Sequence, residues 1–83
     1  MPQFMDVHEG FQGATQADVE AAHKRDLENE KAHGVHFKQW WADPATGKVF
    51  CLSEAPNKEA VIKVHTMSGH PPHEVHELKL GGT

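Results

Sequence analysis

The sequence predicts an α+β domain whose elements follow the order β-α-β-β-α-β. Four segments have the alternating or continuous apolar character of strands, and two have the spacing of amphipathic helices. Glycine and proline residues that form turns separate these segments. The chain has 83 residues, which is room for one domain, so residues 1–83 are expected to fold as a single unit.

The first strand is predicted over residues 3–8, "QFMDVH". Because side chains alternate along a strand, Phe4, Asp6 and His8 share one of its faces. In this element order the first strand lies in the middle of the sheet. Polar side chains on a central strand need partners, since burying an unpaired polar group costs free energy.

The first helix is predicted to begin after Thr15, with Asp18 placed three residues later, close to a capping box. It runs to about Ala32, and Gly34 ends it. The apolar stripe of this helix includes two polar residues. Its members are Val19, Ala22, His23, Asp26 and Leu27.

A β-hairpin follows over residues 35–43 and 48–54. The first segment, "VHFKQWWAD", is rich in aromatic and β-branched residues, and the second, "KVFCLSE", is almost continuously apolar. Between them, "DPATG" has proline and glycine at the positions that a tight turn favours.

A second helix and a last strand complete the order. Asn57 is the predicted N-cap of the helix, and Gly69 with two prolines ends it. Its apolar stripe is Val61, Val64, His65 and Met67 or Ser68. The last strand is predicted over 74–80. These elements predict a ferredoxin-like domain, in which two helices cover one face of a four-stranded antiparallel sheet.

The other face of this sheet is expected to be covered by a second subunit. Trp40 and Trp41 are adjacent in a strand and must point to opposite faces, and the strand over 48–54 is apolar on both faces. Such strands are usually buried on both sides, whereas two helices cover only one. We therefore expect a homodimer, and the alternative is a partly exposed apolar face.

Charge and composition exclude several classes of protein. The net charge is −4 with neutral histidines, and lysine and arginine are scattered, so nucleic acid is not an expected partner. No apolar run approaches the roughly 20 residues of a membrane span, and no secretory signal is recognised, so we expect a cytoplasmic protein without a membrane partner. The single cysteine, Cys51, excludes an internal disulfide and a thiolate zinc finger.

Three of the eight histidines stand at three-residue intervals, at His70, His73 and His76. Pro71 and Pro72 prevent a helix through this segment, and a strand would turn His73 and His76 to opposite faces. The triplet is therefore not a ready-made chelating site. We expect His70 and His73 to be exposed polar residues, while His76, on a strand, remains available to a site built from several segments.

Two other histidines, His23 and His65, lie on the apolar stripes of the two helices, which pack on the same sheet face. Each is either a metal ligand or a buried histidine that bonds to a backbone carbonyl. Asp26, three residues after His23, is expected to fix the tautomer of that ring. Asp6 and His8 point to the same side of the first strand.

Imidazole ligands favour nickel, copper, zinc or cobalt over magnesium or calcium. No sequential metal motif such as HExxH is present. The candidate metal ligands are Asp6, His8, His23, His36, His65 and His76. One alternative is a dimeric α+β barrel enzyme or small-molecule binder that uses His8, His23 and His65. Another is a structural dimer whose histidines only set a pH response. An enzyme is less favoured, because no nucleophile elbow or phosphate-binding glycine loop occurs.

Five stretches of the sequence resemble a known family. They are "FMDVH" at 4–8, "AAHKRDL" at 21–27, "GVHF" at 34–37, "VFCLSEAP" at 49–56 and "VIKVHTMSGHP" at 61–71. In this order the chain resembles a family of small bacterial nickel-binding proteins, formerly catalogued as a domain of unknown function. The resemblance implies a ferredoxin-like subunit, a homodimer, and binding of nickel or another divalent transition metal for sequestration or tolerance. On the matching positions it points to His8, His23, His36 and His65, and it leaves open which of them are ligands.

Overall fold

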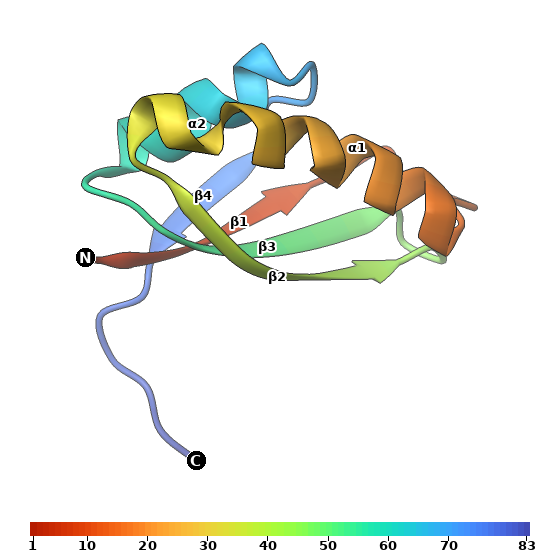
Figure 1. Ribbon diagram of the computed structural model, residues 1–83. Coiled ribbons are helices and arrows are strands. Elements are labelled where there is room, and N and C mark those ends of the chain that lie inside the picture. Colours follow the sequence, from red (N-terminus) through yellow and green to blue (C-terminus); the bar gives the residue numbers. More distant parts are fainter.

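The computed structural model describes residues 1–83 and consists of a four-stranded sheet and two α-helices (Figure 1). In chain order the elements are β1 (Gln3–His8), α1 (Gln16–Asn29), the 3-10 helix η1 (Glu30–His33), β2 (His36–Asp43), β3 (Lys48–Glu54), α2 (Lys58–Met67) and β4 (Glu74–Glu77). The strand order is β2-β3-β1-β4, and every neighbouring pair is antiparallel. Both helices lie over the same face of the sheet (Figure 1). The predicted α+β class is confirmed, and the strand order is compatible with a ferredoxin-like fold. No helix is long and apolar enough to cross a lipid bilayer.

The first helix has a complete capping box at its N-terminus. The Thr15 hydroxyl accepts a hydrogen bond from the Asp18 N–H at 3.2 Å, and the Asp18 carboxylate accepts one from the Thr15 N–H at 2.9 Å. The α-helix ends at Asn29, before the predicted end near Ala32, because the chain tightens into η1 over its last turn. Gly34 then adopts a left-handed conformation with φ of 69°, as the sequence predicts for a residue that ends a helix.

The second helix begins as predicted, but the last strand is shorter than predicted. The Asn57 side chain accepts a hydrogen bond at 2.9 Å from a backbone N–H in the first turn of α2. β4 covers Glu74–Glu77 rather than 74–80. Its partner is β1, which begins at Gln3, and Leu78 donates its N–H to the Gln3 carbonyl at 2.8 Å. The ladder between β1 and β4 ends at this bond.

Two apolar clusters pack between the helices and the sheet. The first consists of Phe4, Val35, Phe37, Ala55, Val61 and Val64. The second consists of Val19, Val49 and Cys51, with Trp40 among the side chains packed against it. The same interior holds buried polar residues, namely Asp6, His8, Asp26, Ser53, His65 and Ser68. Because buried polar groups cost free energy unless they are paired, the contacts among these residues determine what the interior can bind.

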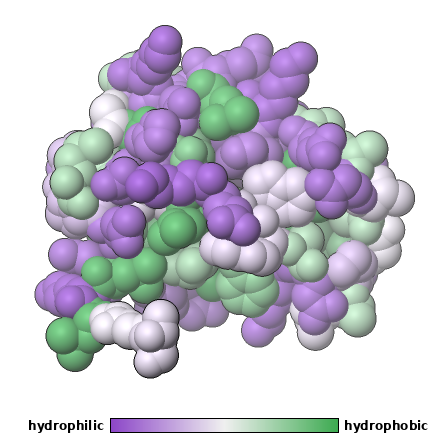
Figure 2. All heavy atoms as spheres, turned by 60° about the horizontal axis from the view of Figure 1, so that its bottom comes forward, coloured by the Kyte–Doolittle hydropathy of each residue, from purple (hydrophilic) through white to green (hydrophobic).

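The two adjacent tryptophans point to opposite faces, as predicted. Trp40 lies opposite Cys51 and packs in the interior, whereas Trp41 lies opposite Phe50 and is 43% exposed. The face that carries Trp41 also carries Met5, Val7, Phe50 and Leu52. Figure 2 shows hydrophobic side chains gathered on this side of the molecule among hydrophilic ones. We call these five residues the open-face patch, because they lie on the sheet face opposite both helices (Figure 1). In the single chain Trp41 is exposed, Met5, Phe50 and Leu52 are half-buried, and Val7 is buried.

Candidate metal centre

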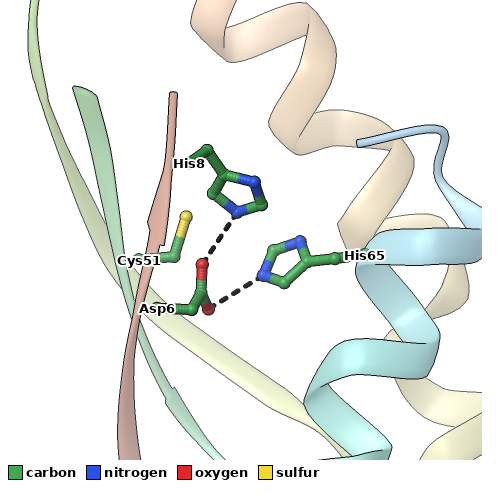
Figure 3. A group of neighbouring side chains, drawn as sticks. All are labelled: Asp6, His8, Cys51 and His65. Carbon is green, nitrogen blue, oxygen red and sulfur yellow. Dashed lines mark hydrogen bonds and ion pairs between the residues drawn. The ribbon is translucent and has the colours of Figure 1, made fainter. Parts of the chain in front are cut away.

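Two polar side chains, Asp6 and His8, project from the central strand β1 toward the helices, and both are buried. Oδ2 of Asp6 accepts a hydrogen bond from Nε2 of His65 at 2.9 Å, and its Oδ1 lies 2.8 Å from Nε2 of His8 (Figure 3). Burial alone would raise the pKa of the Asp6 carboxyl, but its contacts with His65 and His8 outweigh burial and lower that pKa. Asp6 is therefore an anion held in the interior by two imidazoles.

The His65 ring is fully buried and lies between two carboxylates. Its Nδ1 donates to Oδ1 of Asp26 at 2.9 Å, and its Nε2 donates to Asp6. Since an ionised carboxylate only accepts hydrogen bonds, both ring nitrogens carry protons and the ring is an imidazolium. Burial would lower the pKa of His65, but the hydrogen bonds to Asp26 and Asp6 raise it to about 9. A metal ion that binds this ring must therefore displace a proton.

His70 is the second imidazole that contacts the Asp26 carboxylate. Its Nε2 lies 2.8 Å from both carboxylate oxygens of Asp26. A Schellman turn places this ring: Gly69 has φ of 91°, the His70 N–H donates to the His65 carbonyl, and the Gly69 N–H donates to the Thr66 carbonyl. Burial would raise the pKa of Asp26, but its hydrogen bonds with His65 and His70 hold that pKa well below the ordinary value.

Two groups of potential ligand atoms result, each with all its atoms within 4.8 Å of one another. The first group is Asp6, His8, Cys51 and His65, which converge from β1, β3 and α2 (Figure 3). The second group is Asp26, His65 and His70. Burial strongly raises the pKa of the Cys51 thiol, and the carboxylates of Asp6 and Asp26 raise it further. Cys51 is therefore a neutral thiol unless a cation beside it stabilises the thiolate.

Several buried polar atoms in this interior have no aligned hydrogen-bond partner. They are Oδ1 of Asp6, both ring nitrogens of His8, Nδ1 of His23 and the Ser53 hydroxyl. Oδ1 of Asp6 and Nε2 of His8 are close, but their orientation does not form a hydrogen bond. Most buried polar atoms in proteins have a partner, and a cation between this oxygen and this nitrogen would satisfy both.

The remaining interior histidine, His23, lies at the edge of the centre. Its Nδ1 is 3.9 Å from Oδ2 of Asp26, and its side chain is 15% exposed. Burial lowers the pKa of His23 and so favours the neutral ring, the form that binds metals. His23 lines both an inner cavity of about 10 Å³, which His8 and His70 also line, and an outer groove of about 640 Å³ between α1 and β2. With Val19 and Trp40, which also line both, it forms the boundary between the outer groove and the inner cavity.

The structure brings some of the predicted ligands together and leaves others apart. Those brought together are Asp6, His8 and His65, with His23 beside them. His36 and His76 are exposed and lie on the sheet face that points away from the helices. Nε2 of His76 contacts the Glu74 carboxylate at 3.0 Å. Neither of these two histidines reaches the buried groups.

Two interior contacts differ from the sequence prediction. Asp26 was expected to orient His23, but its hydrogen bonds are with His65 and His70. The expectation that His70 is exposed is wrong, because its side chain is only 13% exposed and lies against Asp26. Gly69 is the signal that could have located it, since the Schellman turn at this glycine directs the next residue back toward the helix.

Comparison with known proteins assigns the chain to a family. A family model described as "Nickel responsive protein SCO4226-like" matches residues 4–78. Among solved structures, the crystal structure of SCO4226 from Streptomyces coelicolor A3(2) is 50% identical in sequence and has a TM-score of 0.94, and the match covers 96% of this chain and 99% of that chain. No curated protein matches. The family model spans nearly the whole chain, and the chain therefore belongs to the SCO4226-like family of nickel responsive proteins.

Proposed function

We propose that this protein binds a divalent transition-metal ion, nickel above all, and that it serves metal sequestration or tolerance. The observation that carries the proposal is the convergence of nitrogen, oxygen and sulfur donors within 4.8 Å in the buried group of Asp6, His8, Cys51 and His65. The unaligned Asp6 oxygen and His8 nitrogens in this group support it further. The family is named for its response to nickel, which suggests which ion to test first.

The donor set suits such an ion in chemistry and in spacing. Imidazole and thiolate ligands select transition metals over magnesium and calcium. Imidazole nitrogens and carboxylate oxygens bind at about 2.0–2.1 Å, so two of them at right angles around an ion lie roughly 2.9 Å apart. The Asp6 oxygens already lie 2.8 and 2.9 Å from nitrogens of His8 and His65. Only small side-chain movements are needed for these atoms to share an ion.

His23 is proposed to act on the route by which metal reaches this group. The outer groove between α1 and β2 is open to solvent, and the His23 ring forms part of its wall and part of the wall of the inner cavity. A neutral imidazole at this boundary can take an ion from the groove and pass it inward. His36 and His76 are proposed as additional ligands at the exposed surface, separate from the buried group.

The protein is further proposed to be a homodimer, with the open-face patch covered by a second copy. Trp41, Phe50 and their neighbours form an apolar surface on a sheet face that no helix covers. Faces of this kind in soluble proteins commonly mark contact with another protein. A second copy is the natural occupant because two-fold dimers bring the same patch together from each subunit.

The competing function, a small-molecule binder that uses His8, His23 and His65, fits the geometry less well. Pockets for small organic molecules measure roughly 300–1,000 Å³. The inner cavity that His8 and His23 share is about 10 Å³, which is room for about one water molecule. The outer groove has the volume of a ligand pocket, but His8 and His65 do not line it.

Isothermal titration of the metal-stripped protein with Ni²⁺, Zn²⁺, Co²⁺ and Cu²⁺ tests this function. The matched pair of variants is His8→Gln and His33→Gln: the first removes a buried donor, and the second removes a half-buried histidine, in contact with Met67, that lies outside both donor groups. We expect His8→Gln to weaken Ni²⁺ binding at least tenfold and His33→Gln to leave it unchanged. Equal binding by both variants, with circular dichroism spectra like the wild type, would rule out the buried group as the nickel site.

A further inference from the structure

The two buried donor groups share one residue, His65, and they use opposite sides of its ring. Asp6, His8 and Cys51 lie on the Nε2 side, and Asp26 and His70 lie on the Nδ1 side. The two nitrogens of an imidazole point in divergent directions, so a single ion cannot bind both. Each donor group is therefore a separate position for a cation, with one His65 nitrogen belonging to each.

On the Nδ1 side of His65, Asp26 contacts a second imidazole, which the orientation of His65 alone does not require. A carboxylate that only fixes the tautomer of a metal ligand requires one hydrogen bond to that ligand, and Asp26 makes this bond to His65. Asp26 also faces His70, whose Nε2 lies 2.8 Å from both carboxylate oxygens. The Schellman turn at Gly69 places this ring for contact with Asp26. A carboxylate with two imidazoles is a donor set for a metal in its own right.

We propose that the centre binds two divalent ions, with His65 as an imidazolate bridge between them. This inference rests on the proposed function, because it assigns a second position to the same centre. As the ions bind, the two ring protons of His65 and the thiol proton of Cys51 pass to solvent. The proton on Nε2 of His70, which faces Asp26, moves to Nδ1 of that ring or to solvent, and each vacated atom bonds to a metal ion. The ligands then carry four negative charges, on Asp6, Asp26, Cys51 and the bridging ring. Two divalent ions balance these charges, so the loaded interior has no net charge to bury.

Cu²⁺ is the appropriate probe, because two Cu²⁺ ions joined by an imidazolate couple magnetically and lose most of their electron paramagnetic resonance signal. Native mass spectrometry of the metal-stripped full chain gives the number of ions bound, and the spectrum of the same sample gives the coupling. The exposed ligands are first removed in a background that carries His36→Gln and His76→Gln. In this background we expect two Cu²⁺ per chain and a signal well below that of the total bound copper.

Two variants separate the bridge from the second position. His70→Gln should bind one Cu²⁺ per chain with a full, uncoupled signal, while His33→Gln should retain two coupled ions. One ion per chain with a full signal in the unmodified centre would overturn the bridge and leave the proposed function intact, since Asp26 and His70 would then only orient His65. Two ions with a full, uncoupled signal would also overturn it. No uptake of Cu²⁺ or Ni²⁺ would overturn both proposals.

Discussion

The position of His65 between two carboxylates predicts a loss of stability of the metal-free protein as pH rises. Its pKa is raised from 6.5 to about 9 in the folded protein. Each pKa unit corresponds to about 1.36 kcal/mol, so the protonated ring contributes about 3 kcal/mol to the free energy of unfolding. This amount is large beside the roughly 5–15 kcal/mol by which domains are stable.

The sign follows from the direction of the shift. Because the folded pKa lies above the unfolded one, the contribution is complete below pH 6.5, declines as pH rises toward 9 and is absent above it. His23 has a lowered pKa and acts in the opposite sense, since its contribution is present above 6.5 and is lost as pH falls through its folded pKa. Cys51, whose thiol pKa burial raises from 9.0, loses its contribution only as pH rises above that value. Up to about pH 9 the fall in stability is therefore the His65 effect, reduced by whatever His23 gains.

Urea unfolding at a fixed protein concentration, with metal removed, measures this effect at one pH below 6.5 and one near 9. We expect the free energy of unfolding of the wild type to fall by about 3 kcal/mol between the two. His65→Gln should show little of this fall, and His33→Gln, altered outside the buried network of Asp6, Asp26 and His65, should show all of it. An unchanged wild-type stability across this range would refute the assignment of a buried imidazolium.

Three further predictions concern stability and assembly. Gly69→Ala places a Cβ at φ of 91° and should lower the free energy of unfolding by about 1–2 kcal/mol in urea titrations. It should also weaken metal binding, because it moves His70. Unchanged stability and affinity would contradict the role given to the Schellman turn. Thr15→Ala removes one half of the capping box and should cost about 1 kcal/mol by the same assay, whereas a cost near zero would mean that the box does not stabilise α1. Trp41→Lys introduces a charge in the open-face patch and should convert a dimer into a monomer in sedimentation experiments, and a persistent dimer would place the interface elsewhere.

The order of elements could be predicted from the sequence because each signal is local. The spacing of apolar residues, the capping residues Thr15 and Asn57 and the helix-ending Gly34 act within a few residues of their own position. The length of β4 could not be predicted in this way, since it depends on where its partner strand begins. Residues 78–80 alternate like a strand but have almost no backbone to pair with.

The interior site was predictable only in part. Asp6 and His8 were expected to share one face of the first strand because they alternate with Met5 and Val7, and the structure has both buried on the face toward the helices. The choice of partners depends on distances between segments that are far apart in the chain. Asp26 is three residues from His23 but is hydrogen-bonded to His65, which is 39 residues away. Sequence spacing favours the near pair, whereas the packing of α1 against α2 selects the distant one.

The most direct test of the central claim is a crystal structure of the nickel-loaded protein with anomalous diffraction measured at the nickel edge. Such data locate the ion itself, independently of any effect that a variant has on folding. The account predicts a nickel peak in the buried interior, within bonding distance of Asp6, His8 and His65. Nickel peaks found only beside exposed histidines such as His36 and His76, with the buried hydrogen bonds unchanged, would contradict it.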